Sequence, residues 1–98
     1  MILQTPADFT CNGSQQQLAT DTSKAKWMTI LADSSNGSAV RIGDVNTSGS
    51  RGFPLAAGAS LTLPTISDPM EFYPLNKIYV FGANGTVLHV VYGVEGTN

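Results

Sequence analysis

Hydrophobic and polar residues alternate along much of this 98-residue chain, with the period of two that is typical of β-strands. No segment keeps the apolar period of 3.6 residues that an amphipathic helix requires. Clusters of Gly, Asn, Ser and Pro separate the alternating runs. The pattern predicts strands over residues 15–20, 26–32, 39–44, 52–56, 60–63, 77–83 and 86–92.

Two Asn-Gly dipeptides lie between strand-like runs, and each predicts a β-hairpin. Asn84-Gly85 joins KIYVFGA to TVLHVVYG, and this pair tolerates the positive φ angles of a type I′ turn. Asn36-Gly37 lies within SSNGS, between WMTILAD and AVRIGD, and predicts a hairpin with a longer loop. Both faces of the strands next to Asn84-Gly85 are apolar, which suggests a sandwich interior or a surface between subunits.

The alternation also assigns side chains to the two faces of each strand. One face of the strand at 26–32 carries Trp27, Thr29 and Leu31, and the other carries Met28, Ile30 and Ala32. Trp27 opens a strand that looks half buried, so we expect a role in the core. In the last strand His89 shares a face with Val87 and Val91, which predicts a histidine at a sheet surface or interface.

Proline and weak hydrophobicity mark the segments outside the regular strands. Because proline cannot donate to a β ladder, Pro54 should lie on an edge, and the stretch 64–74 should cross from one sheet to another. The first 24 residues carry the weakest hydrophobic signal, although Phe9 and Cys11 alternate with polar neighbours. We therefore predict a flexible or partner-ordered N-terminal arm at 1–24, a β domain at 25–94 and a loose tail at 95–98.

The expected fold is all-β: a small β-sandwich or jelly-roll-like barrel of about seven strands, with a flexible N-terminal arm. Periodicity does not reveal strand order, so sandwich and jelly roll both stay open. The length fits a single domain.

Charge is scarce, with five Lys or Arg, seven Asp or Glu and a net charge of -2. So few basic residues give no electrostatic footprint for a phosphate backbone, which argues against nucleic acid as a partner. No window approaches the apolar length of a membrane span, and the N-terminus lacks signal-peptide features, so we expect synthesis in a reducing cytoplasm. The single cysteine, Cys11, is expected to be a small buried hydrophobe.

Candidate chemistry is sparse. His89 is the single histidine, and a zinc site would have too few ligands. The run IGDVNTSGSRG superficially resembles a calcium or phosphate loop but lacks both established spacings, so we expect a polar loop, with adventitious calcium at Asp44 as the alternative. Asp68 and Glu71 lie in a proline-bounded loop. The sequence places no second carboxylate at the separation that glycoside hydrolysis requires. We expect no enzyme activity, no cofactor and no metal.

Four segments occur in order: WMTILADSSNGSAVRIGD, NTSGSRG, FPLAAGASLTLP and LNKIYVFGANGTVLHVVYG. Their order and spacing resemble a recurrent domain of small tailed-bacteriophage virion proteins, over about two thirds of the chain. The resemblance implies a structural component of the phage particle and transfers no catalytic residue. The length of 98 residues and the polar N-terminal arm then favour a capsid decoration, or cement, protein that binds the outer surface of the head and stabilises it.

Two alternatives stay open. Related domains also resemble tail, baseplate or connector components. A carbohydrate-binding or host-surface-binding adhesive module would instead display aromatic platforms. The rings with a polar edge that such a module could use are Trp27, Tyr73, Tyr79 and Tyr92.

The decoration hypothesis implies partners and contact surfaces. The partners would be the major capsid protein or other virion proteins, in a virion assembled in the bacterial host cytoplasm. A homo-oligomer is expected, with a trimer favoured. The expected oligomer contact consists of Ile78, Val80, Val87, His89 and Val91. The expected capsid contact consists of Leu3, Phe9, Gln16 and Leu18.

Overall fold

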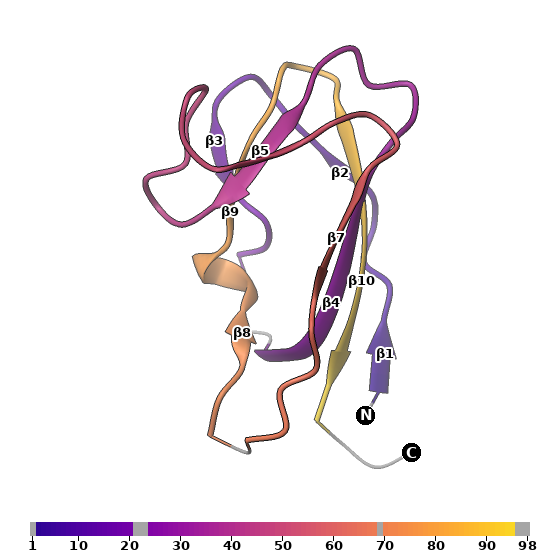
Figure 1. Ribbon diagram of the computed structural model, residues 1–98, viewed down its shortest axis with the longest axis vertical. Coiled ribbons are helices and arrows are strands. Elements are labelled where there is room, and N and C mark those ends of the chain that lie inside the picture. The colour runs from indigo at the N-terminus through magenta and orange to yellow at the C-terminus, as the bar shows by residue number, and fades with distance from the viewer. Residues whose placement is uncertain (1, 21–23, 69, 96–98) are drawn as a thin grey trace.

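The computed structural model describes residues 2–20, 24–68 and 70–95, which form two antiparallel β-sheets with almost no helix (Figure 1). The predicted all-β class is therefore confirmed. The described residues contain ten strands and one short 3-10 helix: β1 (Ile2–Gln4), β2 (Phe9–Thr10), β3 (Gln15–Gln17), β4 (Lys24–Ala32), β5 (Val40–Gly43), β6 (Phe53–Leu55), β7 (Ser60–Leu63), β8 (Tyr73–Pro74), η1 (Leu75–Lys77), β9 (Tyr79–Phe81) and β10 (Val87–Val94).

The larger sheet has the order β1-β10-β4-β7, with β2 also paired to β10 and β8 also paired to β4. Its centre is the long antiparallel pair β4 and β10, which runs from Leu88 opposite Ala32 to Gly93 opposite Trp27. The smaller sheet has the order β3-β9-β5-β6. In Figure 1 the strands β4, β7 and β10 run side by side along the long axis, and β3, β5 and β9 gather at one end.

The core lies between the two sheets and follows the predicted alternation. Strand β4 buries Met28, Ile30 and Ala32, and β10 buries Leu88, Val90 and Tyr92. These side chains pack with Val40 and Ile42 of β5, Val80 of β9 and Leu55 of β6. Because full burial of such a side chain stabilises the folded state by about 1.5–3 kcal/mol, this inner layer is the main source of stability.

The N-terminal segment differs from the predicted flexible arm. It carries three short strands, and β1 and β2 pair with the two ends of β10 while β3 pairs with β9. Cys11 and Leu18 of the same segment are buried in the core. Strand β3 lies within the predicted strand at 15–20, whereas β1 and β2 were not predicted. Each of these short strands gains order by pairing with a strand that is already in a sheet. Of the predicted tail, residues 96–98 lie outside the described residues.

Both predicted hairpins are wrong. Strand β9 pairs with β3 and β5 in the smaller sheet, whereas β10 pairs with β1, β2 and β4 in the larger one. The turn between them is real, since Thr86 N–H donates to the Ala83 carbonyl at 3.0 Å. Only Gly85 has a positive φ, at +93°, and Asn84 does not, so the type I′ conformation that favours a tight hairpin is absent from this turn. Likewise β4 and β5, on either side of Asn36-Gly37, lie in different sheets.

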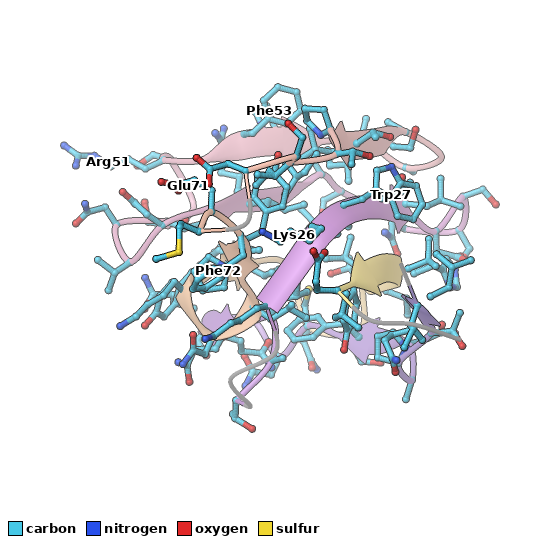
Figure 2. The ribbon with its side chains drawn as sticks, turned by 90° about the horizontal axis from the view of Figure 1, so that it is seen from below. Lys26, Trp27, Arg51, Phe53, Glu71 and Phe72 are labelled. Atoms are coloured by element: carbon cyan, nitrogen blue, oxygen red, sulfur yellow. The ribbon has the colours of Figure 1, made fainter. Side chains whose placement is uncertain are left out.

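The proline-rich stretch 64–74 also differs in part from its prediction. It joins β7 to β8, and both pair with β4, so it stays with the larger sheet; the chain crosses later, through η1. The buried Lys26 holds this stretch in place, because its Nζ donates to the Asp68 carbonyl at 2.8 Å and to the Glu71 carbonyl. Figure 2 shows Lys26 next to this connection. The prediction for Pro54 is confirmed, since β6 is an edge strand.

Two segments change sheets at one corner. The chain passes from β2 to β3 there, and alongside it passes from β9 to β10. The segments are joined by backbone hydrogen bonds from Cys11 to Thr86 (2.8 Å), from Gly85 to Cys11 (2.9 Å) and from Gly13 to Gly82 (3.0 Å). A Cβ atom on Gly82 would lie 2.7 Å from the Cys11 Sγ and 2.8 Å from the Thr86 Oγ1. The corner therefore requires glycine at position 82.

We predict that Gly82→Ala lowers the free energy of unfolding by about 1–3 kcal/mol, because the new methyl group overpacks the corner. Urea denaturation measures the change. Gly37→Ala is the matched control, since a Cβ atom there meets nothing within 4 Å and the glycine has no positive φ. Equal stability of the two variants would contradict this account of the corner.

Candidate functional site

The candidate site is the outer face of the larger sheet, which is the face turned away from the core. By strand register and burial it is formed by Leu3, Trp27, Thr29, Leu31, Ser60, Thr62, Val87, His89 and Val91. Leu3 is 65% exposed and Leu31 is 40% exposed, although both are large apolar side chains. Trp27 is half-buried on this face and does not belong to the core, so its predicted core role is wrong.

Register places these residues in rows across the strands. Leu3 lies opposite Gly93, and Gly93 lies opposite Trp27. In the middle of the sheet the hydroxyl groups of Thr29 and Thr62 are hydrogen bonded to each other at 3.1 Å. No Lys, Arg or Glu belongs to the outer face as defined here. An exposed, partly apolar surface with few charges is typical of protein–protein contact regions.

At one end of the outer face, His89 lies between two carboxylates. Its Nδ1 is 2.9 Å from the Asp8 Oδ1, and its Nε2 is 2.8 Å from the Asp33 Oδ1. Asp8 precedes β2, Asp33 follows β4 and His89 lies in β10, so the cluster joins three separate parts of the chain. We call Asp8, His89 and Asp33 the histidine clip.

The geometry of the clip favours the charged imidazolium form of His89. A neutral imidazole donates from one nitrogen only, whereas here each nitrogen faces a carboxylate oxygen that requires a donor. The bonds to Asp33 and Asp8 raise the pKa of His89 above its ordinary value of 6.5. Bonds from Ser35 and from His89 lower the pKa of Asp33 to about 2.

The clip is a structural link and not a catalytic arrangement. Both ring nitrogens of His89 are occupied by carboxylates, so neither is free to accept a proton from a substrate. The neighbouring hydroxyl, on Ser35, donates to Asp33 and therefore is not activated by the histidine. The clip instead fastens the segment before β2 and the loop after β4 onto β10.

Next to the clip, two hydrogen bonds of the Asn36 side chain extend the pairing of β10. The Asn36 side-chain amide donates to the Val87 carbonyl at 3.0 Å, and its oxygen accepts from the Val87 N–H at 2.8 Å. Asn36 therefore pairs with β10 as a neighbouring strand would. This role, and not the predicted hairpin, explains the contribution of Asn36 to the fold.

The predicted contact residues separate into three groups. Val87, His89 and Val91 from the predicted oligomer contact lie on the outer face, together with Leu3 from the predicted capsid contact. Val80 and Leu18 are buried in the core, where they cannot contact a partner. Ile78 and Phe9 are half-buried against the core, and the Gln16 side chain accepts a hydrogen bond from the Asn12 N–H.

Sequence reasoning placed His89 on the correct face but missed its partners. Asp8 and Asp33 are 81 and 56 residues away from His89 in the chain. Only the pairing of β4 with β10 and of β2 with β10 brings them together. Asp33 directly follows a strand, and that position was the one local signal that could have suggested a role at a sheet end.

Neither the arrangement of the described side chains nor similarity to known proteins identifies a metal site or a protein family. Among the described residues, no group of three or more His, Cys, Asp or Glu side chains is placed to hold a metal ion. The Asp44 side chain instead accepts a hydrogen bond from the Asn46 N–H at 2.9 Å. Within the same residues, no helix has the length and hydrophobicity needed to cross a membrane. Protein-family models, curated proteins and solved structures gave no match to the chain.

The clip predicts a stability maximum in mildly acidic solution. The pKa of His89 is raised above 6.5, so its contribution is complete below pH 6.5 and is lost as the pH rises through the raised pKa. The pKa of Asp33 is lowered from 3.8 to about 2, so its contribution is complete above pH 3.8 and is lost as the pH falls towards 2.

His89→Gln tests this prediction, because glutamine can hydrogen bond but does not titrate. We expect the stability difference between wild type and His89→Gln to be largest between pH 3.8 and pH 6.5 and to shrink above neutral pH. Thermal unfolding across the pH range measures the difference, and NMR titration of the ring protons measures the pKa of His89. A difference that stays constant from about pH 5 to about pH 9 would show that the clip is not charged in this way.

Proposed function

We propose that this chain is a phage virion structural protein, and specifically a capsid decoration protein that binds the outer surface of the head. The observation that carries the proposal is the partly apolar outer face of the larger sheet, whose charged groups are confined to the histidine clip at one end. The four ordered segments that resemble small tailed-phage virion domains support the same function. So does the all-β, two-sheet architecture.

Docking through the outer face has a physical rationale. Burial of apolar surface stabilises a complex by roughly 25 cal/mol per Å², and Leu3 and Leu31 leave apolar surface in water in the isolated chain. The threonines at the centre are already hydrogen bonded to each other, so covering them leaves fewer unpaired polar groups. A capsid surface is therefore the occupant that we assign to this face.

The structure changes how the predicted contacts can be used. Leu3 and the residues Val87, His89 and Val91 were predicted to bind different partners, yet they lie on one face. The same residues cannot contact the capsid and another copy of the chain at the same time. In this proposal the outer face contacts the capsid, and the contacts of the homotrimer lie elsewhere on the surface.

Copy number in purified virions distinguishes a head protein from a tail protein. We expect a ratio to the major capsid protein that is close to that of a regular surface lattice, since decoration follows capsid symmetry. Quantitative mass spectrometry of the particles measures this ratio. A few copies per particle would mean a tail, baseplate or connector component, and absence from the particle would overturn the virion proposal.

Leu31→Lys tests the docking face directly. Leu31 is partly exposed, so we expect the variant to fold, but the buried charge should abolish binding to capsids that lack this protein. Co-sedimentation with such capsids measures binding, and thermal unfolding checks the fold. Val45→Lys is the matched control, because Val45 is 60% exposed and lies in the loop between β5 and β6. Equal binding by both variants would exclude the outer face as the capsid contact.

A further inference from the structure

Strand β7 ends the larger sheet on one side, where, among the described residues, it pairs with β4 alone. Figure 1 shows β7 beside β4 along the long axis of the molecule. A strand in this position has backbone N–H and C=O groups along its free side that can pair with another strand. We call this free side of Ser60–Leu63 the β7 edge.

The hydrogen bonds between β7 and β4 show which residues of β7 direct their backbone outward. In an antiparallel pair, alternate residues bond to the partner strand, and the residues between them point to the other side. The Ala32 N–H donates to the Ala59 carbonyl at 2.9 Å, so Ala59 directs its carbonyl at β4. Two residues further on, Leu61 also faces β4, opposite Ile30. Ser60 and Thr62 therefore present their N–H and C=O groups to the β7 edge.

The β7 edge lacks features that commonly protect a free strand from pairing. Proline and charged side chains on the edge strand are two such features. On the edge strand β6 of the smaller sheet, Pro54 removes one N–H. Ser60–Leu63 contains neither proline nor a charged residue, and the whole run 52–67 carries no charge. The β7 edge is therefore open to pairing with another strand.

The part of this edge that can pair is short. Pro64 occupies the next outward position of the chain and has no N–H to donate. At the other end, the Gly58 N–H already donates to a carbonyl of β4 at 2.9 Å. Only Ser60 and Thr62 offer both backbone groups, so a long extended peptide would gain few hydrogen bonds here. A second copy of the same strand needs only these two residues.

A second copy of the chain complements the β7 edge because a two-fold axis places the same surface on both sides of a contact. Like charges that meet across such an axis repel, and the charge-free run 52–67 avoids this repulsion. With Leu61 of both copies at the axis, Ser60 lies opposite Thr62 of the second copy. Each of these two equivalent pairs exchanges two hydrogen bonds, which makes four in total. The half-buried Leu61 then packs against Leu61 of the second copy.

We propose that two copies of this chain associate through the β7 edge, so that their larger sheets become one continuous antiparallel sheet. The outward backbone groups of Ser60 and Thr62 carry the inference, and the charge-free run 52–67 supports a second copy as the occupant. The inference goes beyond capsid decoration and does not depend on it. A two-fold contact joins two copies, so it differs from the trimer that the resemblance favours, and the mass in solution distinguishes the two.

Thr62→Pro tests the proposal, because proline removes the outward N–H and leaves the backbone groups of Leu61 and Leu63 free to bond to β4. Thr62→Val is the matched control, since both variants lose the hydroxyl that bonds to Thr29 but valine keeps its N–H. Sedimentation equilibrium over a range of protein concentrations measures the mass. We expect twice the mass of one chain for the wild type and Thr62→Val, and the mass of one chain for Thr62→Pro. Thermal unfolding shows whether each variant is folded.

Amide hydrogen exchange of the wild-type protein, followed by NMR at high and low protein concentration, is a second test that requires no variant. We expect exchange at Ser60 and Thr62 to become severalfold faster on dilution, while Leu61 and Leu63, bonded to β4 in both states, change little. A monomer or a trimer at every concentration would overturn the proposal, and so would a dimer that folded Thr62→Pro retains. These measurements use no capsids, so they are independent of the docking test.

Discussion

The two-layer fold depends on one corner, where the chain changes sheets twice. At this corner the backbone of Cys11 exchanges hydrogen bonds with Gly85 and Thr86, and Gly82 lies against the Cys11 side chain. Because both connections turn together, β9 and β10 can enter different sheets and direct their apolar sides at each other. Burial raises the pKa of the Cys11 thiol, which favours the neutral form that this apolar site requires.

The periodicity of the sequence predicted where the strands lie and which residues share a face, but not which strands pair with each other. Each of the seven predicted strand regions contains a strand, and the residues that share a face of β4 and of β10 were grouped correctly, although Trp27 was expected in the core and lies on the outer face. The pattern of a strand depends on its own burial, so it is visible locally. The partner of a strand is decided by packing between distant segments. For this reason Asn84-Gly85 correctly marked a turn but wrongly suggested a hairpin, and β1 and β2 of the N-terminal segment were not among the predicted strands.

The same distinction applies to the functional surfaces. Alternation placed His89, Val87 and Val91 on one exposed face, because that assignment needs only the residues of a single strand. The carboxylates of the clip come from elsewhere in the chain and required the strand register. The loop 44–52 is the polar connection between strands that the sequence predicted. Its backbone carbonyls accept hydrogen bonds from the side chains of Gln15 and Arg41, which no local pattern encodes.

The antiparallel pairing of β1 with β10 has a mechanical consequence. Ile2 lies directly opposite Val94, so the two ends of the described sheet are neighbours. A force that pulls these ends apart would open the β1–β10 pairs one after another, as a zipper opens, and would not load them all at once. Peeling would proceed past Gln4 until it met the bond between Asp8 and His89. The clip is therefore the first charged side-chain link that is reached when β1 separates step by step from β10.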